Sequence, residues 1–387
     1  MRFEFATATR IIFGPGTLAE VGPAARTFGQ LAFVVVGTAG ERVMPLLATL
    51  MQQRVAVTIF KIAGEPDIEQ VQRALEQVRI EKPDMVIGFG GGSAVDAGKA
   101  VAILATNGGE PLDYLEVIGR GKTLTQPALP YIAVPTTAGT GAEVTRNAVL
   151  VSPGHRVKAS LRSPLMLPRL AVVDPVVTHT MPPDTTASTG LDALTQLIEP
   201  FVSTRATPIS DAFCREGIQR VARSLRRAYA HGDDASARED MSLASLLGGL
   251  ALANAGLGAV HGIASVVGGM FAAPHGAVCA RLLPHVMAAN VRALQERQPE
   301  GPALARYDEI ARLLTGRSDA KAEDGIRWVC ELCRDVQIPP LAAYGMSGRH
   351  VRSVVEKSLL ASSTKANPIA LTEEEMKAVV YDAIRAR

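Results

Sequence analysis

The stretch Pro83–Ile103, PDMVIGFGGGSAVDAGKAVAI, is the most informative part of the sequence about the fold. It places a short apolar run, Met85–Gly88, before the tetrapeptide Gly90–Ser93, and a helical pattern over Ala94–Ala105 after it. Consecutive glycines let backbone N–H groups approach a phosphate, and a helix N-terminus adds partial positive charge. The spacing matches neither G-x-G-x-x-G nor a Walker A motif. The position between strand and helix therefore predicts a phosphate-binding loop, with a simple tight turn as the alternative.

Other short apolar runs on both sides of this stretch share its strand character. Helical patterns such as Ile68–Val78 separate them. Continuous apolar strands that alternate with helices predict a parallel sheet covered by helices on both faces, the α/β architecture of dinucleotide-binding domains. The remaining predicted strands are Leu31–Val36, Val55–Phe60, Tyr131–Val134 and Leu170–Val173.

The pattern changes after Asp174 and Pro175. Pro183 and Asp184 have the character of a helix start, with proline early and an acidic first turn. From there to Arg387 nearly every segment has helical periodicity. We therefore predict an α/β dinucleotide-binding domain over residues 1–180 and an all-α domain over residues 181–387.

Composition excludes several classes of protein. Of 387 residues, 47% are hydrophobic and 20% charged, which excludes a disordered chain. The 40 basic and 38 acidic residues form no strongly basic run, so we expect no nucleic-acid partner. Four cysteines are too few for a disulfide framework and fit a reducing compartment. The N-terminal sequence MRFEFATATRIIFGPG has no signal-peptide pattern, and we expect a cytoplasmic protein.

One segment, Met241–Ala280, contains no Lys, Arg, Asp or Glu. A membrane-spanning helix needs ~20 strongly apolar residues, and this segment is instead rich in glycine and contains His261, Pro274 and His275. We therefore predict buried helices of a protein without membrane association. The two histidines are expected to face a site shielded from water.

A second polar loop, Pro135–Gly141 with the sequence PTTAGTG, follows the predicted strand Tyr131–Val134. Its three hydroxyls suit a polar ligand at the point where strand order reverses in a parallel sheet, although a capped turn is the alternative. Asp96 and Lys99 follow the first loop. They are predicted to be capping residues, surface charges or residues that orient the loop.

Several long segments, in this order, resemble the iron-containing (group III) alcohol dehydrogenase family. The resemblance extends over nearly the whole chain and is specific for the family rather than for a substrate. It implies a dinucleotide-binding domain, a helical metal-binding and catalytic domain, and an active site in the cleft between them. The segments are GGGSAVDAGKA (90–100), PTTAGTGAEVT (135–145), KASLRSPLMLPRLAVVDP (158–175), TGLDALTQLIEPFVS (189–203) and AVHGIASVVGGMFAAPHGAVCARLLPHVM (259–287).

The resemblance also implies which residues bind the nicotinamide cofactor. Family members with a preference for NAD often carry an acidic residue after the second strand, where this chain has residues 37–40, GTAG, with Arg42 nearby. Gly37 therefore permits NADP as well as NAD. The implied cofactor contacts are Gly91, Gly92 and Ser93 with the pyrophosphate, Thr136, Thr137 and Thr140 with the adenosine and phosphate region, and Lys158 with the ribose near the nicotinamide.

The family binds one divalent metal through an Asp, a His four residues later, and two further His residues fourteen apart. Asp192, His261 and His275 match this pattern, and residues four apart share one helix face. Position 196 is Gln, whose neutral amide oxygen is a weak ligand. We therefore expect loosely held Fe2+ or Zn2+, with Gln196 as the candidate fourth ligand. Ser265 stands where many members have another His, which leaves the proton donor open.

The leading hypothesis is an NAD(P)-dependent alcohol dehydrogenase or aldehyde reductase in which Asp192, His261 and His275 hold the catalytic metal. Its expected substrate is a small alcohol, aldehyde or keto compound, and the resemblance implies a homodimer or larger homo-oligomer. Gln196 keeps open a metal-independent reductase of the maleylacetate reductase type. The loss of two family histidines keeps open a cofactor-binding protein with little catalysis.

Overall fold

The computed structural model describes residues 2–37, 40–155 and 157–385. The chain divides into two compact units, an α/β unit over Phe5–His179 and a helical unit over Thr180–Arg387 with the N-terminal residues up to Glu4. The predicted fold class is confirmed, because a parallel sheet with helices is followed by a mostly helical region.

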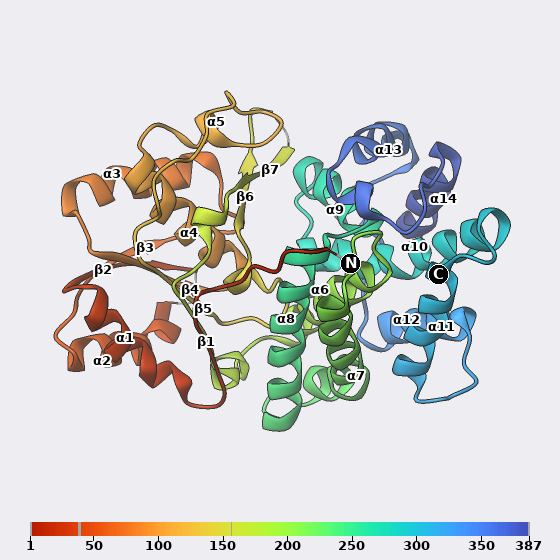
Figure 1. Cartoon of the computed structure of the whole chain (residues 1–387), viewed down its shortest axis with the longest axis horizontal. Helices are drawn as coiled ribbons and strands as arrows, with labels where there is room; N and C mark the ends of the chain where they lie inside the picture. Colours follow the sequence, from red (N-terminus) through yellow and green to blue (C-terminus); the bar gives the residue numbers. More distant parts are fainter. Residues whose placement is uncertain (1, 38–39, 156, 386–387) are drawn as a thin grey trace. The chain divides into compact units, whose positions relative to one another are not determined.

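The α/β unit is built on a six-stranded, entirely parallel sheet with the order β1-β8-β5-β4-β2-β3. Because β2 and β4 are neighbours in its interior, the strand that carries the glycine-rich loop lies at the middle of the sheet (Figure 1). The strands are β1 (Ile11–Phe13), β2 (Leu31–Val36), β3 (Ala56–Lys61), β4 (Met85–Gly90), β5 (Tyr131–Pro135) and β8 (Leu170–Val173).

Helices cover both faces of this sheet, as the continuous apolar strands predict (Figure 1). Val34 and Ile87 pack with the core of α1 and α2 on one face, whereas Phe33 and Val86 pack with the core of α3 and α4 on the other. Both faces of β2 and β4 are therefore buried, which explains their lack of polar alternation. The helices are α1 (Val21–Phe28), α2 (Met44–Gln52), α3 (Ile68–Glu81), α4 (Gly92–Asn107) and the short α5 (Pro111–Tyr114).

An antiparallel hairpin of β6 (Asn147–Ser152) and β7 (Val157–Arg162) was not predicted from the sequence. It packs beside α4, and alternate residues of both strands are buried, among them Leu150 and Leu161. Lys158 consequently lies on strand β7, and its side chain is buried.

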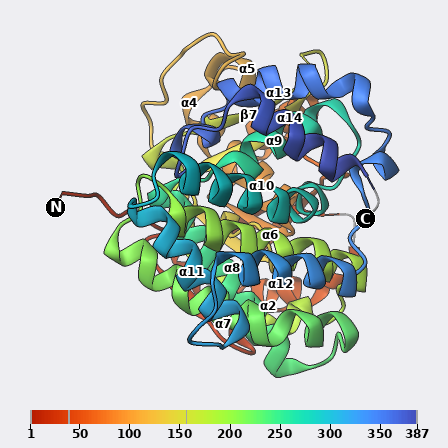
Figure 2. The same ribbon diagram turned by 90° about the vertical axis from the view of Figure 1, so that its right-hand side faces the viewer.

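The helical unit is organised around α6 (Pro183–Val202), which is buried almost continuously from Gly190 to Val202. Helices α6, α7 and α8 pack against one another, and α10 packs on α6 and α9 (Figure 2). The remaining helices of this unit are α7 (Pro208–Ala230), α8 (Ala235–Ala255), α9 (Ala259–Met270), α10 (His275–Arg297), α11 (Pro302–Thr315), α12 (Ala322–Asp335), α13 (Val351–Leu360) and α14 (Glu373–Ile384).

The charge-free segment Met241–Ala280 forms most of α8, all of α9 and the first turns of α10. In the part of the chain that the structure describes, no single helix has the length and apolar character to cross a membrane. Helices α8 and α9 meet that criterion only as a pair, and a bend of 100° separates them.

Candidate cofactor pocket and metal centre

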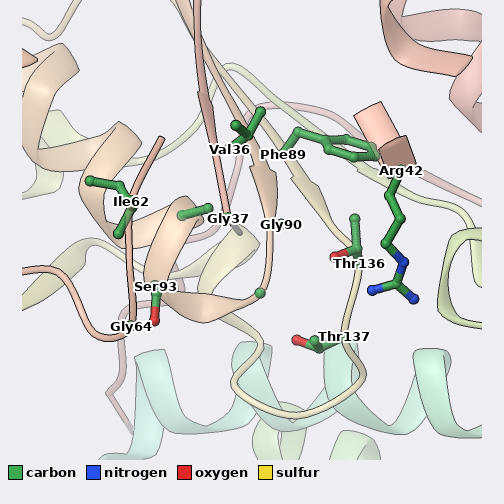
Figure 3. A pocket seen from close by; sticks show the side chains of 12 residues that line it. Val36, Gly37, Arg42, Ile62, Gly64, Phe89, Gly90, Ser93, Thr136 and Thr137 are labelled. Atoms are coloured by element: carbon green, nitrogen blue, oxygen red, sulfur yellow. The ribbon is translucent and has the colours of Figure 1, made fainter. Parts of the chain in front are cut away.

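A pocket of about 230 Å³ lies at the carboxyl ends of β2, β4 and β5 (Figure 3). The chain leaves β2 towards β3 and returns to β4 on the other side of β2, so strand order reverses between these two strands. Open α/β sheets bind ligands in the crevice at this reversal. The lining residues are Val36, Gly37, Arg42, Ile62, Gly64, Phe89, Gly90, Gly91, Ser93, Ala94, Thr136 and Thr137.

The floor of this pocket requires glycine at position 90. Gly90 has φ +155°, and a Cβ atom there would lie 2.7 Å from the Cβ of Ala94 and 3.2 Å from the backbone nitrogen of Gly37. The first turn of α4 therefore lies closer to the end of β4 than a side chain at position 90 would permit, and the end of β2 leaves little room beside it. Gly91 is the N-cap of α4 and supplies no side-chain cap, so the first N–H groups of the helix can bind an anion.

The residues implied for cofactor binding fall into three groups. Gly91, Ser93, Thr136 and Thr137 line the pocket. Gly92 and Thr140 pack against each other, because a Cβ on Gly92 would lie 2.8 Å from the Thr140 side chain. Lys158 is ion-paired with Glu65, the neighbour of the lining residue Gly64.

Asp96 and Lys99 are neither surface charges nor caps. The buried Lys99 ammonium donates to the carbonyl of Ala142 and to the hydroxyl of Thr145, each at 2.8 Å, and also to the carbonyl of Asn147. Asp96 lies 3.0 Å from that ammonium and accepts a hydrogen bond from the backbone of Val149. These two residues of α4 therefore fix the segment that follows the loop Pro135–Gly141, the threonine loop.

Glu143, in the same segment, is a buried carboxyl that sequence reasoning missed. Burial raises its pKa to about 7, although Lys99 lowers it and Asp96 raises it further. Glu143 lies in the segment PTTAGTGAEVT (135–145), but its unusual environment arises only when α4 packs against that segment.

Four side chains from three helices of the helical unit form a candidate metal centre. Asp192 lies on α6, His261 on α9, and His275 and Cys279 on α10. One potential ligand atom from each lies within 4.8 Å of all the others. The structure therefore brings together Asp192, His261 and His275, with the amide of Gln196 beside Asp192, and adds Cys279, which sequence reasoning missed although it lies one helical turn after His275.

Glu199 orients His261 within this cluster. Its Oε2 atom lies 2.6 Å from Nδ1 of His261, and its Oε1 atom accepts a hydrogen bond of 2.7 Å from the backbone of Val260. The Nε2 atom of His261 then faces Oδ1 of Asp192 at 3.4 Å. A carboxylate on the far nitrogen is the usual support of a metal-binding histidine. Glu199 stands two turns after Asp192 on α6, which is the signal that could have revealed it.

The donor set fits a divalent cation. Burial alone would raise the pKa of Asp192, but His261, His275 and the amide of Gln196 together hold it below its ordinary value. Within the described residues, the buried Oδ1 of Asp192 and Oε1 of Gln196 have no hydrogen-bond partner. Burial raises the pKa of the Cys279 thiol to about 12, and a thiol that binds a metal gives up its proton.

Ser265, at the position of the missing second histidine, does not join this cluster through its hydroxyl. Its Oγ donates to the carbonyl of Gly262 at 2.9 Å, one turn earlier on α9. The hydroxyl therefore satisfies the backbone of its own helix.

Comparison with known proteins identifies the family of this chain. Residues 8–175 match the family described as iron-containing alcohol dehydrogenase, and residues 186–384 match the C-terminal region of the same family. Alcohol dehydrogenase 4 of Schizosaccharomyces pombe is 36% identical over 379 residues, covering 96% of this chain and 87% of that protein.

Solved structures agree with this match. A 1,3-propanediol oxidoreductase is 34% identical, with a TM-score of 0.91 and coverage of 99% of this chain and 100% of that one. Sulfoacetaldehyde reductase from Bifidobacterium kashiwanohense, solved in complex with NAD+, is 28% identical with a TM-score of 0.87 and full coverage of both chains, 100% each. The chain belongs to the iron-containing alcohol dehydrogenase family and is an oxidoreductase that acts on CH–OH groups.

Proposed function

We propose that this protein is an NAD(P)-dependent alcohol dehydrogenase and aldehyde reductase that uses one divalent metal ion. The observation that carries the proposal is the cluster of the buried Asp192 and His261 with the partly buried His275, in which Glu199 holds the ring of His261. Asp192, His261 and His275 would hold a metal ion whose positive charge would polarise an alcohol or carbonyl oxygen, and a nicotinamide cofactor held by the α/β unit would supply or accept the hydride. The family assignment favours this catalytic role over cofactor binding alone.

In the α/β unit, the chain's own groups bind and orient the cofactor. The backbone N–H groups at Gly91, Gly92 and Ser93 hold the pyrophosphate at the N-terminus of α4. Thr136 and Thr137 contact the adenosine and phosphate region from the end of β5, with Thr140 behind Gly92. Lys158 hydrogen-bonds the nicotinamide ribose. Its ammonium group is ion-paired with Glu65 in the structure and would weaken that pair when it turns to the ribose.

We also propose that the pocket accepts NADP as well as NAD. Among the described atoms, a Cβ on Gly37 would meet nothing within 4 Å, so the space beside the end of β2 is open. Arg42 lines the same pocket with a guanidinium group, which suits a 2′-phosphate. No carboxylate at position 37 repels that phosphate.

In the helical unit, the proposed metal ligands are Asp192, His261 and His275. Gln196 is at most a weak ligand, and its amide hydrogen-bonds Asp192. The expected substrates are small alcohols and the matching aldehydes or ketones. We further propose a homodimer or larger assembly in the cytoplasm, where the free cysteines Cys214, Cys279, Cys330 and Cys333 stay reduced.

The test is activity with NAD and NADP on a panel of short alcohols and diols, with the Asp192→Ala and His261→Ala variants beside the wild type. We expect both variants to fold, as shown by circular dichroism, and to lose activity by ~100-fold or more. Full activity in either folded variant, or wild-type activity that survives metal removal by a chelator, would favour the metal-independent reductase instead.

A further inference from the structure

We propose that Cys279 is the fourth metal ligand, so that the centre is an Asp-His-His-Cys site with a preference for zinc. Cys279 follows His275 by one turn of α10, so both side chains project from the same face of that helix. Its Sγ atom lies 3.6 Å from Nε2 of His275, and the residue is fully buried.

The distances in the cluster agree with a tetrahedral ion. Zinc bonds of 2.0–2.3 Å to oxygen, nitrogen and sulfur place neighbouring ligand atoms about 3.3–3.8 Å apart. Here Oδ1 of Asp192 lies 3.4 Å from Nε2 of His261 and 4.0 Å from Nε2 of His275. The 3.4 Å separation and the 3.6 Å between Nε2 of His275 and Sγ of Cys279 show that two edges of the tetrahedron lie within this range, whereas the Asp192–His275 edge is longer and would shorten on binding.

A second observation points to a cation at the same place. Asp192 is 1% exposed, and its Oδ1 atom, which faces both histidines, has no hydrogen-bond partner within the described residues. A buried carboxylate oxygen without a partner is costly unless an ion or a polar ligand satisfies it.

The chemistry of position 279 compensates for that of position 196. Gln196 offers a neutral amide oxygen, whereas Cys279 offers a thiolate that binds zinc strongly. On binding, the S–H bond is replaced by a sulfur–metal bond and the proton leaves to solvent, with no change of oxidation state. Thiolate donors select zinc over harder ions, and the general affinity order also places Zn2+ above Fe2+.

This inference rests on the proposed metal-dependent function and is tested with cobalt as a spectroscopic probe. The chain is stripped with a chelator and reloaded with Co2+ without oxygen, and its near-ultraviolet absorption is recorded with the metal content per chain. The wild type should bind one Co2+ and show a thiolate-to-cobalt charge-transfer band. The Cys279→Ser variant should lose that band, and its zinc affinity should fall at least ~10-fold.

The control is Cys214→Ser, which alters another buried cysteine of the same unit and should keep both the band and the affinity. The Gln196→His/Cys279→Ser double variant should bind Co2+ without the band. If the single variant does not fold, X-ray absorption of the zinc-loaded wild type decides, with one sulfur at about 2.3 Å expected.

A wild-type protein that holds one Co2+ without the band, or without zinc-bound sulfur, would overturn the role of Cys279 and leave the proposed function intact. An unchanged band and affinity in Cys279→Ser would do the same. Failure of the wild type to bind any metal after reconstitution would contradict both proposals.

Discussion

At the scale of single residues, two pairs of residues one helical turn apart supply most of the potential donor atoms of the candidate metal centre. On α6 the pair is Asp192 and Gln196, and on α10 it is His275 and Cys279. The resemblance supplied the first pair and His275, and it drew attention to the missing imidazole at position 196. The spacing of Cys279 from His275 could have been noticed in the same way. Its role as a potential ligand becomes evident only when the packing of α9 and α10 brings His261 near it.

Gly37 offers a residue-scale test of cofactor choice. The side chain of a Gly37→Asp variant fits in the open space beside the end of β2, and its carboxylate would repel a 2′-phosphate. We expect the ratio of kcat/KM for NADP over NAD to fall at least ~10-fold, because like charges in contact cost several kcal/mol.

The matched control is Gly37→Asn, which has the same shape without the charge and should change the ratio much less. Steady-state kinetics with both cofactors measure the effect. Equal shifts in the two variants would show that the size of the side chain, and not its charge, controls selection.

Glu199 offers a second residue-scale test, because it acts on the metal through His261. In Glu199→Gln the carboxylate is replaced by an amide that cannot accept from both His261 and Val260. Zinc affinity, measured by competition with a coloured chelator, should fall ~10–100-fold. A purely structural role would lower the melting temperature of the metal-free protein and leave the zinc affinity unchanged, which would refute the positioning role.

At the scale of elements, α4 links the glycine-rich loop to the threonine loop. Its N-terminus forms one wall of the cofactor pocket, and Lys99, two turns further on, holds the carbonyls of Ala142 and Asn147. Loss of a partner from a buried ion pair typically costs about 3–5 kcal/mol. The position of the threonine loop, which lines the pocket, therefore depends on the contacts of Lys99 as well as on the lining residues themselves.

The buried Glu143 in this region predicts a pH dependence of stability. Its pKa is about 7 in the folded protein against an ordinary value of 4.5, so the folded state holds the proton more tightly than the unfolded state. Stability from this group is full below pH 4.5 and is lost as the pH rises through 7, by at most about 3 kcal/mol. The Glu143→Gln variant should therefore show a smaller fall in melting temperature from pH 5.5 to pH 8 than the wild type.

Glu76→Gln, which alters an exposed carboxyl on α3, should behave like the wild type in the same thermal scans. If Glu143→Gln and the wild type lose the same number of degrees over this interval, Glu143 does not take up its proton on folding.

The predicted strand bounds were most accurate for strands whose two faces are both buried. Strands β2 and β8 have the predicted bounds, because unbroken apolar runs leave one interpretation. Strand β4 is longer than predicted and includes Phe89 and Gly90, since glycine weakens the strand signal. The hairpin of β6 and β7 and the three-residue β1 were missed, because half-buried alternation and short length give weak periodicity.

At the scale of the whole molecule, the two units carry different parts of the chemistry. The α/β unit contains the pocket at the reversal of strand order, and the helical unit contains the Asp192, His261, His275 and Cys279 cluster. Motif order along the chain was enough to predict the fold class and the family. The contacts of Glu199, Lys99 and Glu143 could not be predicted, because each is made between segments far apart in the sequence, although the helical spacing of Glu199 from Asp192 was a usable signal.

The central claim is that this chain holds a divalent metal despite glutamine at position 196. Mass spectrometry of protein purified without chelator and with oxygen excluded measures the metal content per chain. We expect close to one zinc or iron per chain, with activity lost on chelation and restored on reloading. A fully active protein that stays metal-free after attempted reconstitution would contradict it.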